Sequence, residues 1–273
     1  MVKQMQKIFI SILAIFLLPA CAPMHKNAQT AKEPGDLAKL ENISVGYIEK
    51  SEKVKLNRIK LDALNEAALS LGARTGLFWR AKQINESLKE KTEYLDRVFN
   101  FNALLLDNNI LPPVLTENKQ ALNLDSPQSI RISDTNYKII KQARFVTVPP
   151  VWRDYLFMHV NKPEMPDNTL LPKTKEERDV WKKAIREGWE KGILQAEQIY
   201  VENLNRLKRD YQGMIRYRTL LAQNMVSLPL VAKRSLGVTG GGEELSINDR
   251  TLTIKALPSL KADTKEWLPI VTN

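Results

Sequence analysis

The chain has 273 residues, a hydrophobic fraction of 43% and a formal net charge of +10. This length suffices for one large domain or two small ones with a real core, and the apolar fraction is ordinary for a globular protein. The single cysteine excludes an internal disulfide, and two histidines fall short of the ligands that a zinc site needs. The positive charge favours anionic partners, but lipid head groups, acidic proteins and nucleic acid all remain candidates.

Residues 1–20 have the pattern of a secretory signal peptide. Two lysines and no acid precede an apolar run at residues 8–18, which is shorter than the ~20 residues that span a bilayer. The sequence LPAC at 18–21 resembles a bacterial lipobox, in which cleavage falls just before the cysteine and the cysteine receives a lipid. We therefore predict a signal peptide over residues 1–20 and lipidation of Cys21.

The mature chain is predicted to begin with a tether. Residues 21–51 are mostly polar, which suits a lipidated N-terminus joined to a globular domain at residues 52–273. Ala22 follows the cysteine at a place where an aspartate commonly retains a lipoprotein at the inner membrane. The sequence therefore predicts a lipid anchor in the outer membrane, on its periplasmic face.

Two amphipathic helices are predicted at the start of the domain. Apolar residues recur at spacings of three and four over residues 52–71, and a second helical stripe follows over residues 76–102. Gly72 and Gly76 lie between the two patterns, and we expect them to bracket a bend.

Strands and extended loops are predicted next. Paired prolines in NILPPV (109–114) exclude a helix interior there. SIRIS (129–133) alternates polar and apolar residues as a half-buried strand does, and ARFVTVPP (143–150) resembles it. Residues 161–173 contain three prolines and favour an extended loop.

A long helix is predicted after Thr174. Thr174 and Glu177 have the spacing of a capping box, and apolar residues keep a helical period well beyond it. Gly188 and Gly192 lie four residues apart among charged neighbours, which favours close packing of another element against them. We expect Gly213 to interrupt the helix.

The last segment favours a β-hairpin. LSI (245–247) and LTI (252–254) alternate, with NDR (248–250) as the expected turn, and GVTGGGEE (237–244) is expected to form a flexible turn before the hairpin. The sequence as a whole predicts an α+β fold: a mainly helical single domain with short strands and a C-terminal β-hairpin.

No group of residues indicates catalysis. His159 lies among apolar residues and is expected to be packed or hydrogen-bonded, and no Gly-x-Ser-x-Gly elbow is present. Glu176 and Glu177 are explained as first-turn acids of the long helix, and Glu243 and Glu244 as turn residues. We predict no catalytic residue, no cofactor and no metal site; a carboxylate pair in a lipid-anchored cell-wall hydrolase stays open as an alternative.

Four residues are predicted to contact partners. Trp152 and Arg153 belong to a Pro-Pro loop, and aromatic and arginine side chains dominate the energy of interfaces. Arg216 and Arg218 lie in MIRYR (214–218), a mixture of basic and aromatic residues that single-strand nucleic-acid sites also use. A helix with a basic outer face has the same pattern, and this is the interpretation that we prefer here. A DNA-contacting channel component is kept as the alternative.

Several stretches, taken in order and spacing, resemble one family. They are FWRAK (78–82), NILPPV (109–114), QSIRISD (128–134), TVPPVWRDYL (147–156), LPKTK (171–175), LAQNMVS (221–227), GVTG (237–240) and NDRTLTIKALP (248–258). Over residues 57–260 the chain resembles the DotC lipoproteins of type IVB (Dot/Icm) secretion systems. It is similar also to the TraI lipoproteins of related conjugative plasmids.

This resemblance implies an outer-membrane lipoprotein of the secretion core complex, with Cys21 at the family's lipidated position. Such proteins act with a DotD-like lipoprotein to bring the secretin-like DotH-type subunit to the outer membrane. No catalytic residues are carried over from the family, so the resemblance implies scaffolding rather than chemistry. Direct contact with nucleic acid is not expected on this interpretation.

Overall fold

The computed structural model describes residues 35–44 and 58–268. The predicted signal peptide at 1–20 and the predicted lipidation site Cys21 lie outside the described residues, as does most of the predicted tether. No helix among the described residues is both long enough and apolar enough to cross a membrane.

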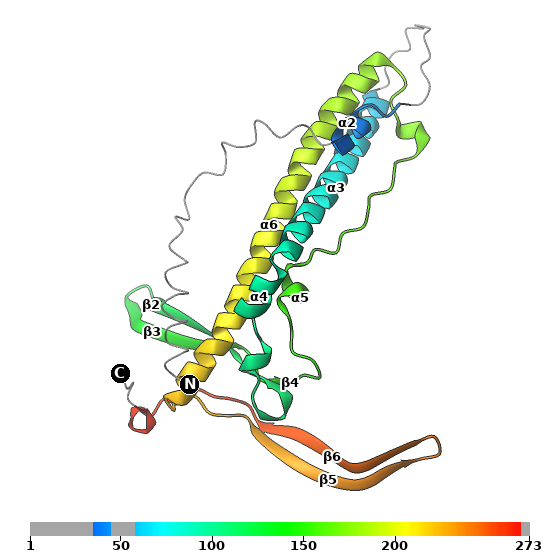
Figure 1. Cartoon of the computed structure of the whole chain (residues 1–273). Helices are drawn as coiled ribbons and strands as arrows, with labels where there is room; N and C mark the ends of the chain where they lie inside the picture. The colour runs from blue at the N-terminus through cyan, green and yellow to red at the C-terminus, as the bar shows by residue number, and fades with distance from the viewer. Residues whose placement is uncertain (1–34, 45–57, 269–273) are drawn as a thin grey trace.

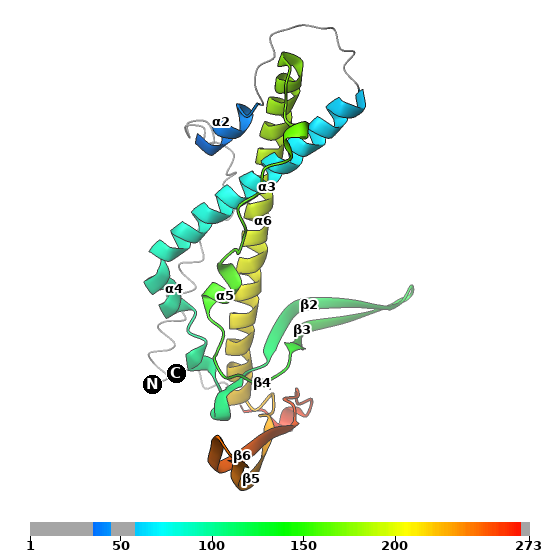
Figure 2. The ribbon, with the colours of Figure 1, turned by 90° about the vertical axis from the view of Figure 1, so that its right-hand side faces the viewer.

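Two long helices, α3 (Arg58–Glu90) and α6 (Lys175–Ala222), form a rod and run in the same direction (Figure 1). At 1.5 Å per residue, the 48 residues of α6 extend over about 70 Å. Figure 2 shows that the two helices cross and then separate. The short helices α4 (Thr92–Val98) and α5 (Trp152–Leu156) lie beside the lower half of the rod.

Four glycines allow α3 and α6 to touch at the crossing. A Cβ on Gly72 would lie 2.3 Å from the backbone oxygen of Ile185, and a Cβ on Gly188 would lie 2.2 Å from that of Leu69. Gly76 and Gly192 repeat these approaches one turn later, so each helix has a glycine pair four residues apart. The predicted close packing at Gly188 is confirmed. The predicted bend at Gly72 and Gly76 is wrong: α3 continues through both glycines, because they are needed for contact rather than for a turn.

The beginning of α6 is fixed as its sequence predicts. The Thr174 hydroxyl accepts a hydrogen bond from the Glu177 N–H, and the Glu177 carboxylate accepts one from the Thr174 N–H. The expected interruption at Gly213 is wrong, because α6 passes straight through it. A Cβ on Gly213 would lie 2.4 Å from Cγ1 of Val114, so this glycine lets the next segment of chain cross the helix.

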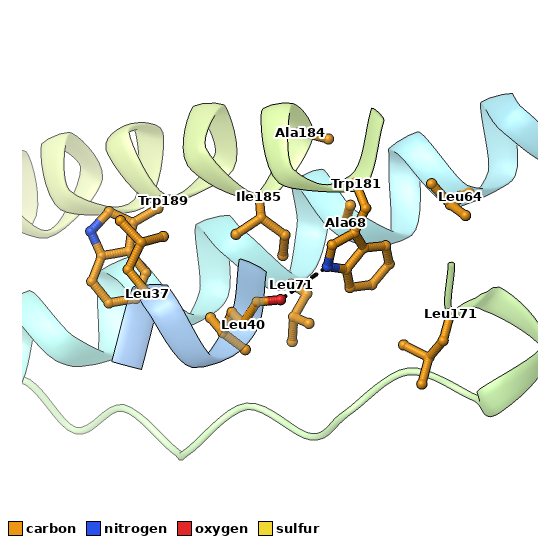
Figure 3. Packing of buried hydrophobic residues seen from close by; sticks show 10 residues of the cluster. All are labelled: Leu37, Leu40, Leu64, Ala68, Leu71, Leu171, Trp181, Ala184, Ile185 and Trp189. Atoms are coloured by element: carbon orange, nitrogen blue, oxygen red, sulfur yellow. Dashed lines mark hydrogen bonds between the residues drawn. The ribbon is translucent and has the colours of Figure 1, made fainter. Parts of the chain in front are cut away.

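A small helix packs on the side of the rod, near the crossing of α3 and α6. The helix α2 (Gly35–Glu41) lies within the predicted tether, yet it packs its Leu37 and Leu40 on α3 and α6. The indole N–H of Trp181 donates a hydrogen bond of 3.0 Å to the Leu40 carbonyl (Figure 3). The apolar cluster drawn in Figure 3 extends to Trp189, so the tryptophans of α6 belong to the core as predicted.

All strands in the described part of the chain form two-stranded antiparallel sheets. Strand β1 (Ile110–Leu111) pairs with β4 (Arg144–Phe145), β2 (Val114–Ser126) with β3 (Ser129–Lys141), and β5 (Leu230–Gly241) with β6 (Glu244–Ala256). Three-residue 3-10 helices η1 (Asn102–Leu104), η2 (Asp107–Asn109), η3 (Asn168–Leu170) and η4 (Thr264–Glu266) lie in the connections. The α+β fold with a C-terminal hairpin is confirmed.

The turn of the C-terminal hairpin differs from the prediction. Strand β6 runs through residues 248–250, which were expected to turn, and the chain reverses after Gly241 instead. Gly242 has a φ of +68°, as a tight turn requires. Asn248 and Gly237 both have positive φ and mark a bulge inside the hairpin, where the strand pairing shifts by one residue. Asn248, which the sequence predicts in a turn, therefore lies in this bulge.

Candidate interaction surfaces

The hairpin β2–β3 forms an arm that projects from the lower half of the rod (Figure 2). Its base is held in the core, where Val114 and Leu115 are buried beside α6. The Arg216 guanidinium donates to the Glu117 carboxylate at 3.1 Å and to the Leu115 carbonyl at 3.0 Å. These bonds fix the direction in which the arm leaves the helix.

The outer part of this arm presents apolar side chains to solvent on one face. Leu122 pairs with Ile132 and Leu124 with Ile130, and residues that pair directly point to the same face of a sheet. Their exposed fractions range from 54% for Ile130 to 73% for Leu124. We call these four residues the β2–β3 tip.

The hairpin β5–β6 forms a second arm at the same end of the molecule (Figure 1). Its base is tied down by the bridge between Val226 and Leu260 and by the bond from the Ser227 N–H to the Ser259 carbonyl. The Tyr217 hydroxyl donates to the Ser227 carbonyl at 3.0 Å, and burial raises the pKa of this tyrosine to about 12.

The outer half of this second arm is also apolar on one face. Val238 pairs with Ile247, and Leu245 is opposite Gly240 on the same face. Val238, Leu245 and Ile247 are each more than 60% exposed, and we call them the β5–β6 tip. Glu244 pairs with Gly241 next to this tip, at the extreme end of the arm.

Both arms have the features of surfaces that bind protein. A two-stranded hairpin alone is marginally stable in water, and its outer strands leave backbone N–H and C=O groups unpaired. Exposed apolar residues that gather on one face are typical of interfaces rather than of ordinary surface. Such arms gain stability when a partner packs on their face or adds a strand to their edge.

The predicted contact residues Trp152 and Arg153 lie on α5. Trp152 is only 1% exposed, and its indole N–H donates to Asp96 at 2.6 Å. Arg153 forms two hydrogen bonds to the same carboxylate, at 2.8 and 3.2 Å, and these bonds together with that of the indole lower the pKa of Asp96. The Trp152 ring is buried and therefore offers no surface to a partner. Partner contact through Arg153 stays a prediction.

The predicted contact residues Arg216 and Arg218 both bind the protein's own backbone. Arg216 holds the base of the β2–β3 arm, and Arg218 donates to the Ala103 carbonyl at 2.8 Å. The structure therefore gives these residues separate hydrogen-bond partners: Trp152 and Arg153 share Asp96, whereas Arg216 and Arg218 bind elsewhere. For Arg216, the contacts indicate a positioning role for the arm next to it.

The acidic residues considered for chemistry are used structurally where the structure describes them. Glu176 and Glu177 lie in the first turn of α6, as expected, and Glu177 is bound by Lys60 as well as by the cap. Across the described ranges, no group of three or more His, Cys, Asp or Glu side chains is arranged to hold a metal ion. His159 is expected from the sequence to be packed or hydrogen-bonded, and the structure shows it exposed, just after the buried Met158.

Sequence reasoning missed the two tips, although one signal was present. SIRIS (129–133) was recognised as a strand with one apolar face. The matching alternation in ALNL (121–124), eight residues before it and separated by a Ser-Pro-Gln turn, predicts its partner strand. Alternation of polar and apolar residues predicts a strand but does not reveal whether its apolar face is covered. The structure shows that this face of β2 and β3 is exposed.

One comparison with known proteins bears on identity. The family described as "Type IV secretory system, conjugal DNA-protein transfer" (T4SS_TraI) matches residues 58–269, from the first residue of α3 to just beyond the last described residue. No curated protein sequence matches the chain. Because the family match spans most of the chain and both arms, the chain belongs to the TraI family of type IV secretory systems for conjugal DNA–protein transfer.

Proposed function

We propose that this protein is a non-enzymatic scaffold of a type IVB secretion or conjugation core complex. Within that complex it would be anchored by a lipid on Cys21 in the outer membrane, facing the periplasm. With a DotD-like lipoprotein it would help to bring a secretin-like, DotH-type subunit to that membrane. Membership of a conjugal transfer family supports the setting. The resemblance of residues 57–260 to DotC lipoproteins, noted in the sequence, supports the finer role.

The observation that carries the proposal is the pair of uncovered β-arms. A component of a multi-protein secretion system needs surfaces on which neighbours pack, and the exposed apolar tips have the character of such surfaces. The bases of both arms are fixed by hydrogen bonds to α6, so each arm leaves the rod from a defined position. This arrangement suits the assembly of protein neighbours in a defined geometry.

The proposal is tested in a host that carries the complete conjugation system. Serine is placed at Leu124 and Ile132 in one variant and at Leu245 and Ile247 in another. We expect either variant to accumulate to wild-type levels but to retain at least tenfold less of its neighbouring subunits on affinity isolation, and to transfer DNA at a correspondingly lower frequency. As a matched control, Leu194→Ser and Val201→Ser change two exposed apolar residues on α6 instead.

Wild-type recovery of partners with both tip variants, or equal loss with the α6 control, would overturn the scaffold role of the arms. The anchor is tested separately with Cys21→Ser, followed by separation of the two membranes. We expect the serine form and the secretin-like subunit to leave the outer membrane together. If the subunit keeps its location and DNA transfer is untouched, Cys21 is not the anchor that the proposal requires.

A further inference from the structure

A second surface lies beside α5, away from both tips. Strand β4 and the loop after it form an open pocket with Asp154; its lining residues are Arg144, Phe145, Val146, Thr147, Val148, Pro149, Pro150 and Asp154. A neighbouring pocket on α6 is lined by Glu202, Asn203, Asn205, Arg206 and Arg209. Tyr155 connects the two, because Arg206 lies 5.5 Å from its ring and the charge of Arg144 also acts on its phenol.

The buried carboxylate of this region is already fully used. Asp210 accepts hydrogen bonds from Lys141 at 2.5 Å, from Arg209 at 3.0 Å and from the Tyr155 hydroxyl at 3.2 Å. Burial, reinforced by this carboxylate, raises the pKa of Tyr155, so the phenol stays neutral. Asp210 therefore pairs with Lys141 and Arg209, and it forms no ion pair with Arg144 or Arg206.

Arg144 and Arg206 are exposed, and neither forms an ion pair with another of the described residues. Glu202 lies one helical turn before Arg206 without pairing with it, and Asp154 is occupied by the Val151 N–H at 2.9 Å. These two guanidinium groups both lie near the neutral Tyr155, and they can bind carboxylates, which arginine binds in bidentate fashion.

Apolar side chains and a free strand edge lie next to the arginines. Val148 is 75% exposed, and Phe145 and Val151 are also exposed. Strand β4 pairs with β1 on one side, and no other described strand pairs with it. An extended chain can add to such an edge through its backbone and place alternate side chains on the two faces.

We propose that Arg144, Arg206 and the loop 145–150 bind an extended segment of a protein partner in which carboxylates alternate with apolar side chains. A nucleic acid fits this surface less well, because its continuous row of phosphates would meet Asp154 and Glu202. Separate carboxylates can instead lie against the two arginines, while the apolar residues cover Phe145 and Val148. The inference rests on the proposed scaffold role in one respect: that role makes another subunit of the complex the source of the segment.

The test uses detergent-solubilised full-length protein and a fluorescein-labelled peptide of sequence GSDVELDVELSG, followed by fluorescence anisotropy in 50 mM NaCl. We expect the peptide to bind, and its counterpart with Asn and Gln in place of Asp and Glu to bind at least tenfold more weakly. The double variant Arg144→Gln, Arg206→Gln should lower affinity for the acidic peptide at least tenfold. The control Lys182→Gln, Lys183→Gln removes the same charge from exposed positions near the other end of α6 and should change affinity less than twofold.

Three results would overturn the inference. They are absence of binding to the acidic peptide, an equal loss in the lysine control, and tighter binding of a 20-nucleotide single-stranded DNA that depends on the same two arginines. The last result would make this a nucleic-acid surface. The arm-tip experiment is independent of these outcomes, because it alters residues outside this surface and measures assembly rather than peptide binding.

Discussion

At the scale of single residues, Glu177 shows how one buried carboxylate joins two distant parts of the chain. It accepts hydrogen bonds from Lys60 of α3 at 2.5 Å and from the backbone N–H groups of Lys173 and Thr174. Burial opposes its ionisation, but the bonds from Lys60 and the two N–H groups outweigh burial and lower its pKa. The charged form therefore stabilises the contact between the first turns of α3 and α6.

Glu177→Gln is expected to lower the free energy of unfolding by about 1–3 kcal/mol at pH 7, because charge-assisted hydrogen bonds are lost in a buried site. The pKa of Glu177 is lower in the folded than in the unfolded chain, so its contribution is present above the unfolded value of 4.5 and lost as the pH falls through the folded value. Urea unfolding at pH 7 and pH 3.5 checks this. A difference between wild type and variant that is as large at pH 3.5 as at pH 7 would contradict it.

At the scale of elements, the crossing of α3 and α6 depends on glycine rather than on the size of apolar side chains. The backbones approach so closely at Gly72 and Gly188 that an added methyl group would meet main-chain atoms, which cannot rotate away. Both glycine pairs are visible in the sequence, but the place of Gly72 and Gly76 between two helical patterns predicts a bend. A glycine pair between helical stretches is compatible with either a turn or a close helix contact. Local sequence does not distinguish the two, because the partner helix lies more than 100 residues further along the chain.

Gly72→Ala and Gly188→Ala are each expected to destabilise the protein by about 1–3 kcal/mol, since overpacking forces the helices apart. Gly35→Ala, on the short helix α2, adds the same methyl group where no atom lies within 4 Å and should be neutral within about 0.5 kcal/mol. Chemical denaturation of the three variants measures the contrast. Equal stability of Gly72→Ala and Gly35→Ala would show that the close crossing does not exist in solution.

The arms behave differently as elements, because their apolar tips are not part of the core. Leu124→Ser and Ile247→Ser should change the free energy of unfolding by no more than about 0.5 kcal/mol, as expected for exposed positions. Leu207→Ser, at a fully buried position of α6, should cost several times as much. Thermal unfolding compares them, and a large loss for either tip variant would mean that the tips pack within the molecule.

At the scale of the whole molecule, the fold separates a rod from two arms at one end of it (Figures 1 and 2). The sequence predicted the α+β class, the beginning of α6 and its core tryptophans, because capping and helical periodicity are local signals. It did not predict which faces stay uncovered, because Leu122 and Ile132 show the same alternation as a strand packed on a core. The turn of the last hairpin was misplaced because Asn248, a frequent turn residue, forms a bulge there.

The central claim is that the arm tips contact neighbouring proteins of the transfer complex, and site-specific photocrosslinking in conjugating cells tests it most directly. A photoreactive amino acid is placed at Leu124, at Ile247 or, as a control, at the exposed Lys183 on α6. We expect the two tip positions to form crosslinks to other subunits of the secretion system and Lys183 to form few. Crosslinks that are absent from both tips, while wild-type DNA transfer continues, would contradict the claim.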